Sequence, residues 1–167
     1  MLYWPTELSD GGDFFNLFRY ITFRAGGAFM TSLMFGFLFG LPLINVLRRK
    51  QGKGQPIRDD GPESHLAKQG TPTMGGLLIV GALLTSTLLW ARLDNPYVWM
   101  VLFVTMSFAL IGFADDYAKV SKQNTAGVSG KIRLALGFAI AGIAGYWAAQ
   151  YHPVDLSNQL AVPVFKD

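Results

Sequence analysis

The chain has 167 residues, of which 51% are hydrophobic and only 15% are charged, with a net charge of +3. A soluble domain carries about 25% charged residues, so this composition indicates a membrane protein. Cysteine is absent, which excludes disulfides, thiolate metal sites and cysteine nucleophiles within these residues. The basic residues cluster between apolar runs and form no contiguous stripe, so we expect no nucleic-acid partner.

Four uncharged runs predict an all-α, polytopic membrane fold. They cover residues 25–47, 69–91, 95–114 and 134–154. A helix needs about 20 residues to cross a lipid bilayer, so each run is long enough for one span. We expect spans at about 25–47, 71–91, 95–117 and 134–152, with loops at about 48–70 and 118–133. The N-terminus lacks the usual form of a cleavable signal peptide, so the first span is expected to remain in the membrane.

The basic residues predict the orientation of these spans. Ten of the fourteen lie in the two segments that follow the first and third runs. Lysine and arginine are enriched in cytoplasmic loops, so both segments are predicted to be cytoplasmic and both termini periplasmic. The short turn Arg92-Leu93-Asp94 predicts a tight helical hairpin between the second and third spans. With no internal repeat and no second set of polar groups, the chain is interpreted as part of a larger protein.

The first basic segment contains two groups of turn-forming and polar residues. They are Asp59-Asp60-Gly61-Pro62-Glu63-Ser64-His65 and Lys68-Gln69-Gly70-Thr71-Pro72-Thr73-Met74-Gly75-Gly76. Thr71 followed by Pro72 predicts a helix start, with threonine as the N-cap. The N–H groups of that helix end, beside Lys68, would suit an anion. A purely structural role in starting and packing the second span is equally compatible with these residues. His65 is a candidate proton carrier, although a loop histidine is more often simply solvated.

The third run ends in two adjacent carboxylates, Asp115 and Asp116. They repel each other, and the C-terminal end of a helix disfavours anions, so the pair needs a cation. Mg²⁺ is bound through one or two carboxylates plus substrate phosphates, which makes the pair a candidate catalytic and magnesium site. Ion pairing with Lys119, three and four residues further on, is the structural alternative.

The segment Gly127-Val-Ser-Gly130-Lys131 has some features of a phosphate-binding loop. It lacks the first glycine of that motif, where Thr125 stands, and the Ser/Thr, where Ile132 stands. We therefore expect only a flexible glycine turn that presents Lys131 and Arg133 to substrate phosphates.

Three blocks together resemble the phospho-N-acetylmuramoyl-pentapeptide transferase family of peptidoglycan synthesis. They are Asp60-Gly-Pro-Glu-Ser-His65, Lys68-x-Gly-Thr-Pro-Thr-Met-Gly-Gly76 and Gly112-Phe-x-Asp-Asp-Tyr-x-Lys119. The resemblance covers essentially the whole chain. It implies the N-terminal half of a larger bundle, with roughly ten spans of about 20 residues each.

The resemblance also implies an activity and a set of site residues. The activity is transfer of phospho-MurNAc-pentapeptide from UDP-MurNAc-pentapeptide to undecaprenyl phosphate, giving lipid I and UMP with Mg²⁺, at the cytoplasmic face of the bacterial inner membrane. Asp115 and Asp116 match the family's catalytic pair. The positions that line its cytoplasmic cleft match Lys68, Thr73 and Lys119, with His65 in the first block. Arg133 stands where the family usually has lysine, and a guanidinium is not equivalent to an ammonium.

The resemblance leaves two further expectations. The family's later catalytic aspartate and its histidine-rich loop are absent from this sequence, so residues 1–167 alone are expected to be inactive. A second copy of the protein is a further candidate partner, alongside the lipid bilayer.

Two alternative functions remain open, and a third, the UbiA-like one, is disfavoured. The GlcNAc-1-phosphate transferases share the aspartate pair and the topology, although the block ending at His65 favours the pentapeptide substrate. A UbiA-like prenyltransferase would need an Asp-x-x-Asp repeat, which does not follow Asp116. A transporter or channel with an acidic ion site would need a polar path along the spans, where only isolated hydroxyls such as Thr31 and Ser107 occur.

Overall fold

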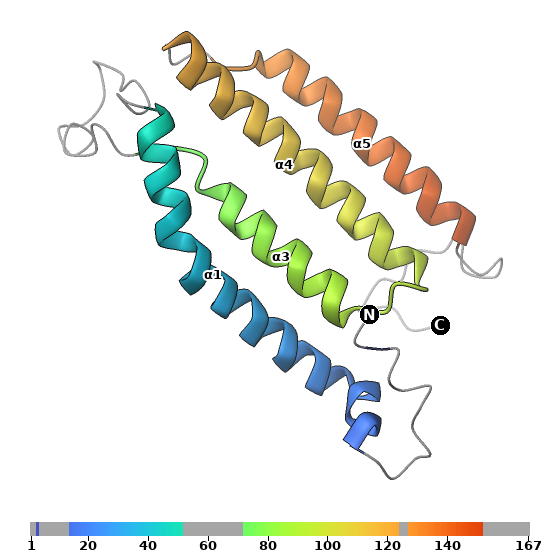
Figure 1. Cartoon of the computed structure of the whole chain (residues 1–167). Helices are drawn as coiled ribbons and strands as arrows, with labels where there is room; N and C mark the ends of the chain where they lie inside the picture. Colours follow the sequence, from blue (N-terminus) through green and yellow to red (C-terminus); the bar gives the residue numbers. More distant parts are fainter. Residues whose placement is uncertain (1–2, 4–13, 52–71, 124–126, 152–167) are drawn as a thin grey trace, which may run out of the picture.

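The computed structural model describes residues 3, 14–51, 72–123 and 127–151 of the chain. All regular structure in these residues is helical, as the composition predicts. The elements are a 3-10 helix η2 (Phe14–Arg19) and the α-helices α1 (Ile21–Gln51), α3 (Gly76–Trp90), α4 (Pro96–Lys122) and α5 (Gly130–Tyr151). The α-helices lie side by side in chain order, each antiparallel to the next, and form one layer (Figure 1).

Three of these helices, α1, α4 and α5, are long and apolar enough to cross a membrane. The fourth, α3, has only 15 residues. At about 1.5 Å per residue it is roughly 22 Å long, which is short of the ~30 Å hydrocarbon core. The second predicted span is therefore a shorter apolar helix over its described residues.

The predicted helix start at Thr71 and Pro72 is wrong. Pro72 lies before the helix, which begins at Gly76 with Gly75 as its N-cap and with no side-chain cap. Met74, in between, has a left-handed backbone with φ of 70°. The reason is that the backbone groups of Thr73 bond to a side chain of α1, described below, instead of to helical partners. Thr71 itself lies outside the described residues.

The second inter-helix segment is more helical than predicted. Helix α4 continues to Lys122 and ends at Gln123, whose left-handed backbone closes the helix. Helix α5 already begins at Gly130. Residues 123–129 alone therefore lie between the two helices, and both Lys131 and Arg133 belong to the first turn of α5.

Helices α1 and α3 pack closely where glycines face large side chains. Gly27 lies against the indole ring of Trp90, and a Cβ at this position would overlap it. Trp90 also donates a hydrogen bond from Nε1 to Thr31 Oγ1 at 2.9 Å, and Phe18 of η2 stacks on its ring. Small residues allow this approach of helix backbones, which is how helices associate in lipid.

The predicted hairpin between α3 and α4 is present. Asn95 caps α4 by accepting a hydrogen bond at Oδ1 from the Tyr97 N–H at 2.9 Å, and Pro96 occupies the first turn. In the turn, Arg92 and Asp94 form an exposed ion pair at 2.6 Å. The hydrogen bond from Arg92 holds the pKa of Asp94 below its ordinary value.

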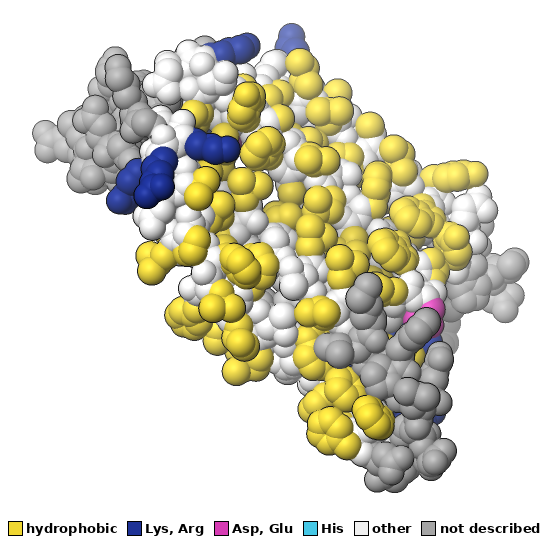
Figure 2. Space-filling view, in the orientation of Figure 1, with side chains coloured by type: hydrophobic (Ala, Val, Ile, Leu, Met, Phe, Trp, Pro, Cys, Tyr) yellow, Lys and Arg dark blue, Asp and Glu magenta, His cyan; other side chains and the backbone are white. Residues whose placement is uncertain are grey.

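The surface of the described layer is mostly apolar, with charge gathered at its ends. Leu47, Ala82, Leu102 and Ile140 are the buried hydrophobic residues of the described part, while Phe37 and Phe138 are more than 70% exposed. Figure 2 shows hydrophobic side chains along the layer and Lys and Arg side chains at one end of it. The last turns of α1 and α4 carry five basic residues, Arg48, Arg49, Lys50, Lys119 and Lys122. Such a surface suits helices surrounded by lipid or by further apolar helices.

Candidate active site

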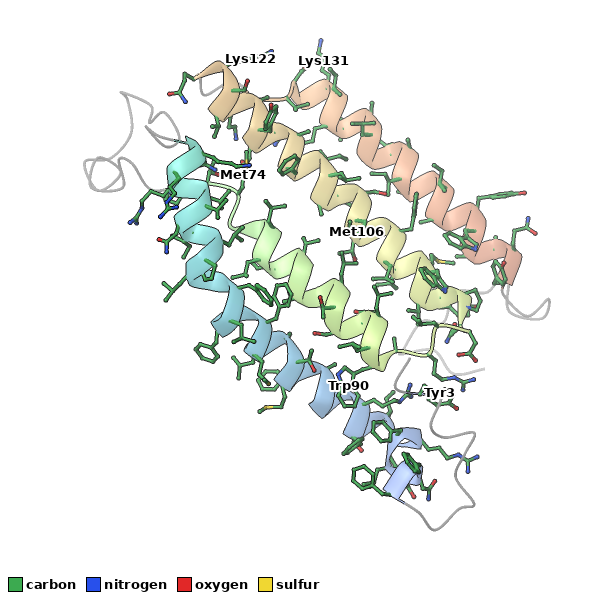
Figure 3. All side chains as sticks on the ribbon, in the orientation of Figure 1. Tyr3, Met74, Trp90, Met106, Lys122 and Lys131 are labelled. Atoms are coloured by element: carbon green, nitrogen blue, oxygen red, sulfur yellow. The ribbon has the colours of Figure 1, made fainter. Side chains whose placement is uncertain are left out.

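The two predicted site segments meet at one end of the layer. Helices α1 and α4 end there, and α3 and α5 begin there (Figure 1). Met74, Lys122 and Lys131 all lie at this end, whereas Trp90 and Tyr3 lie at the opposite one (Figure 3). The zigzag of the helices thus places the aspartate pair, the segment 72–75 and the basic helix ends together, as the sequence predicts.

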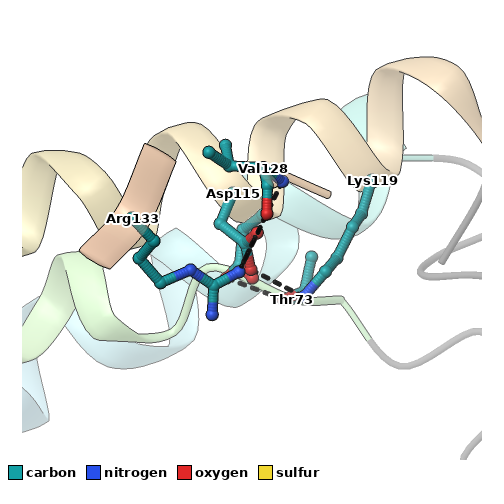
Figure 4. Close-up of polar contacts among 6 residues, drawn as sticks. Thr73, Asp115, Lys119, Val128 and Arg133 are labelled. Carbon is teal, nitrogen blue, oxygen red and sulfur yellow. Dashed lines mark hydrogen bonds and ion pairs between the residues drawn. The ribbon is translucent and has the colours of Figure 1, made fainter. Parts of the chain in front are cut away.

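Asp115 is the buried charge of this site, with only 7% of the residue exposed. Lys119 Nζ lies 2.7 Å from its Oδ2, and Arg133 Nη2 lies 2.6 Å from its Oδ1. The Val128 N–H also donates to Oδ1, at 2.8 Å (Figure 4). The carboxylate is therefore neutralised by two cations, which is the condition for keeping a charge away from water. Asp115 ties α4 to α5, and its pairing with Lys119 is the one expected as the structural alternative.

The turn before α5 is shaped around Asp115. Gly127 has φ of 59°, in the left-handed region that favours glycine, and a Cβ there would overlap Asp115 Oδ1. Val128, the next residue, points its N–H at the same oxygen, and its carbonyl accepts from Arg133 Nη2 at 3.3 Å. The segment with features of a phosphate-binding loop does bind an anion, but that anion is the carboxylate of Asp115.

Asp116 has a different environment from its neighbour. It is half-buried, and its Oδ2 accepts a hydrogen bond from Thr73 Oγ1 at 3.0 Å. Within the described residues it makes no ion pair, so the alternative pairing with Lys119 does not form. The carboxylate of Asp115 is thus neutralised by two cations, whereas that of Asp116 can still accept further hydrogen bonds.

Gln51 is a site residue that the sequence pattern did not indicate. It is the last residue of α1 and is 8% exposed. Its Nε2 donates to the Thr73 carbonyl at 3.0 Å, and its Oε1 accepts from the Thr73 N–H at 2.8 Å. The only available signal was its position, since an uncharged polar residue follows three basic ones at the end of the first span.

A cavity of about 480 Å³ opens beside the two aspartates. Asp115 and Asp116 are the charged residues that line it, and most of its other walls come from apolar residues of α3 and α4, including Leu77, Val80, Met106, Leu110 and Phe113. A pocket with apolar walls and a few polar groups at one place is the usual form of a small-molecule site. This one suits an amphiphile whose polar group sits near the carboxylates.

The remaining predicted site residues are not part of this network. Lys131 is exposed, is directed away from the layer in Figure 3, and makes no hydrogen bond or ion pair with the described residues. His65 and Lys68 lie outside the described residues. Their roles as substrate-binding groups stay predictions.

The aspartate pair predicts a magnesium site, which requires carboxylate oxygens that are not already occupied. The described residues contain no group of three or more His, Asp or Glu side chains that would hold a metal ion unaided. Mg²⁺ does not need one, because it commonly takes one or two carboxylates, water and substrate phosphates. Both oxygens of Asp115 are engaged with cations, whereas Asp116 keeps acceptor capacity. Of these two carboxylates, that of Asp116 is therefore the one with an oxygen available to Mg²⁺ in the described structure.

Comparison with known proteins agrees with the blocks in the sequence. Residues 68–80 match the phospho-N-acetylmuramoyl-pentapeptide-transferase signature 1. The chain is 81% identical to the phospho-N-acetylmuramoyl-pentapeptide-transferase of Ruegeria sp. strain TM1040 and 82% identical to that of Ruegeria pomeroyi, each over 167 residues. It is 71% identical to that of Dinoroseobacter shibae over 168 residues. Each match covers 100% of this chain but 46% of the relative, so the chain spans about half the length of these relatives.

Proposed function

Because this chain belongs to the phospho-N-acetylmuramoyl-pentapeptide-transferase family, matching its N-terminal part, we propose an activity for the whole protein that contains it. That protein transfers phospho-MurNAc-pentapeptide from UDP-MurNAc-pentapeptide to undecaprenyl phosphate, forming lipid I and UMP. The observation that carries the proposal is the hydrogen bond between Thr73, inside the matched signature, and Asp116 of the aspartate pair. Two blocks far apart in the sequence form one site.

The reaction joins two phosphate groups, so the site must balance negative charge. In such transfers catalysis rests on positioning and on cations placed at the phosphate oxygens. Asp116 would hold Mg²⁺, which when bound would neutralise the diphosphate. The hydroxyl of Thr73 would fix the orientation of that carboxylate.

Asp115 would act through its two cations. Arg133 is half-exposed, and its bonds to Asp115 and Val128 both come from Nη2. Its other guanidinium N–H groups would therefore be available to a substrate phosphate. Lys119 is more enclosed, with 21% of its side chain exposed. Lys68, Lys131 and His65 are proposed as further substrate contacts on the strength of the family resemblance.

The proposed lipid substrate fits the apolar cavity. Its walls from α3 and α4 would take part of a prenyl chain, while the phosphate would lie at the end formed by Asp115 and Asp116. The chain is a multi-pass membrane protein, and the basic helix ends favour a cytoplasm-facing site in the bacterial inner membrane. A homodimer stays a prediction.

The test uses the full-length protein in detergent with undecaprenyl phosphate. We expect UMP and lipid I from UDP-MurNAc-pentapeptide, dependence on added Mg²⁺, and little reaction with UDP-GlcNAc. Preferred turnover of UDP-GlcNAc would instead support the related GlcNAc-1-phosphate activity. Membrane insertion without transfer of either sugar would support the transporter or channel alternative.

A further inference from the structure

One side chain connects the end of α1 to the candidate active site. The amide of Gln51 makes two hydrogen bonds to the backbone of Thr73, one to its carbonyl at 3.0 Å and one from its N–H at 2.8 Å. Thr73 in turn donates its hydroxyl hydrogen to Asp116. We propose that Gln51 is a positioning residue, which holds Thr73 so that its hydroxyl orients the Asp116 carboxylate. The inference rests on the proposed function for its catalytic consequence.

The backbone at Thr73 needs the partner that Gln51 provides. Residues 72–74 are not helical, so neither the N–H nor the carbonyl of Thr73 has a helical partner. Backbone groups near the apolar part of a membrane must be satisfied by protein, since an unpaired group is costly there. Glutamine is long enough and offers one donor and one acceptor side by side. Glutamate lacks the donor and lysine lacks the acceptor, so neither replaces both bonds.

The conformation that follows Thr73 strengthens this requirement. Met74 has φ of 70°, which is unfavourable for a residue with a side chain. Such conformations persist only where surrounding contacts hold them in place. The two bonds from Gln51, which is itself buried, immediately precede Met74 and supply that constraint.

The link reaches Asp116 through a single hydrogen bond. Thr73 Oγ1 lies 3.0 Å from Asp116 Oδ2, and no other described group bonds to this carboxylate. If Thr73 shifts, the carboxylate loses its only fixed contact in the described structure. A misplacement of about 1 Å in an active site can cost about 100-fold in rate, so small shifts of Asp116 should be visible in turnover.

The test measures transfer by the full-length protein carrying Gln51→Met, which keeps length but removes both bonds, or Gln51→Glu, which removes the donor. We expect kcat to fall about 10- to 100-fold with little change in KM. The matched control is Gln123→Glu. This exposed glutamine follows α4, and its side chain bonds to the Val120 carbonyl and not to Thr73. It should keep the activity of the unsubstituted protein. Wild-type kcat in either Gln51 variant would overturn the inference.

A double-mutant cycle separates positioning from general stabilisation of the fold. In a Thr73→Ala background the hydroxyl is gone, so Gln51→Met should lower kcat by less than about 2-fold further. Thr73→Ser, which keeps the hydroxyl, should restore the full effect of Gln51→Met. An equal loss in both backgrounds would show that Gln51 acts independently of the Thr73 hydroxyl and would overturn the inference.

Amide hydrogen exchange tests the bonds between Gln51 and Thr73 without relying on the proposed function. Gln51→Met should speed exchange of the Thr73 amide, whatever substrate the enzyme uses. Unchanged exchange would overturn the inference even if lipid I is formed. Absence of transfer by the unsubstituted protein, with faster exchange in the variant, would instead overturn the proposed function.

Discussion

Thr73 donates its hydroxyl hydrogen to Asp116 at 3.0 Å, across 43 positions of the sequence. The bond joins the non-helical segment before α3 to the last turns of α4. It also distinguishes Asp116 from Asp115, which is bound to Lys119, Arg133 and the Val128 N–H. The two adjacent acids should therefore respond differently to the same substitution.

Asp116→Asn should abolish most transfer without unfolding the protein. The substitution removes a carboxylate that no described cation neutralises, so little internal electrostatic stabilisation is lost. We expect turnover to fall by roughly 100-fold or more, because the charge that would hold Mg²⁺ is gone. The measurement is UMP release at saturating Mg²⁺, together with thermal unfolding in detergent. Retained turnover would mean that Asp116 is structural.

Asp115→Asn should lower stability as well as turnover. Lys119 and Arg133 would then face each other without the carboxylate that they share. Loss of one partner from a largely buried charged network costs about 1–3 kcal/mol. Thermal unfolding should show a clear decrease for Asp115→Asn and a much smaller one for Asp116→Asn. Equal decreases would contradict the division of roles between the two acids.

Gly127→Ala should destabilise the turn between α4 and α5. Alanine is strained at φ of 59°, and its Cβ would overlap Asp115 Oδ1. The cost should be about 1–3 kcal/mol, with a loss of transfer because the Asp115 network shifts. Gly142→Ala is the matched control, since Gly142 lies inside α5 with open space around its Cβ position. That control should be neutral or stabilising by up to about 1 kcal/mol.

Arg133→Ala should weaken both the α4–α5 contact and the binding of substrate phosphate. It removes the bonds to Asp115 Oδ1 and to the Val128 carbonyl. We expect an increase in KM for the UDP substrate and a decrease in kcat. Arg133→Lys should be intermediate, because an ammonium keeps the charge but lacks the planar set of N–H donors of a guanidinium. Lys122→Ala, at an exposed lysine in the last turn of α4, is the control for simple loss of positive charge. A similar increase in KM in Lys122→Ala would point to a general electrostatic effect.

Gly27→Ala should loosen the contact between α1 and α3. The added Cβ would overlap the ring of Trp90, which is fixed by Thr31 and Phe18. Overpacking of this kind costs about 1–3 kcal/mol. Gly26→Ala, one residue earlier, meets open space and should leave the unfolding temperature nearly unchanged. Since this contact is at the end opposite Asp116, turnover below the unfolding temperature should be unaffected.

Composition and local patterns were sufficient for several features of this protein. The apolar runs predicted the helices, and the third run, which starts at residue 95, begins next to the start of α4 at Pro96, because helix length depends on the local sequence. The zigzag of those runs also predicted that Asp115, Asp116 and Thr73 share one end of the bundle. The family blocks pointed to the same residues.

Other features depended on how the helices are placed against one another. The side chain of Gln51 reaches Thr73, and the hydroxyl of Thr73 reaches Asp116, only because α1, α3 and α4 lie at fixed depth and rotation. The start of α3 moved from Thr71 to Gly76 for the same reason, since a bond from another helix replaced the local helical one. Local propensity carries no information about partners 22 or 43 positions away. Whether residues so far apart in the sequence come into contact is decided by the packing of the helices, which only the tertiary structure shows.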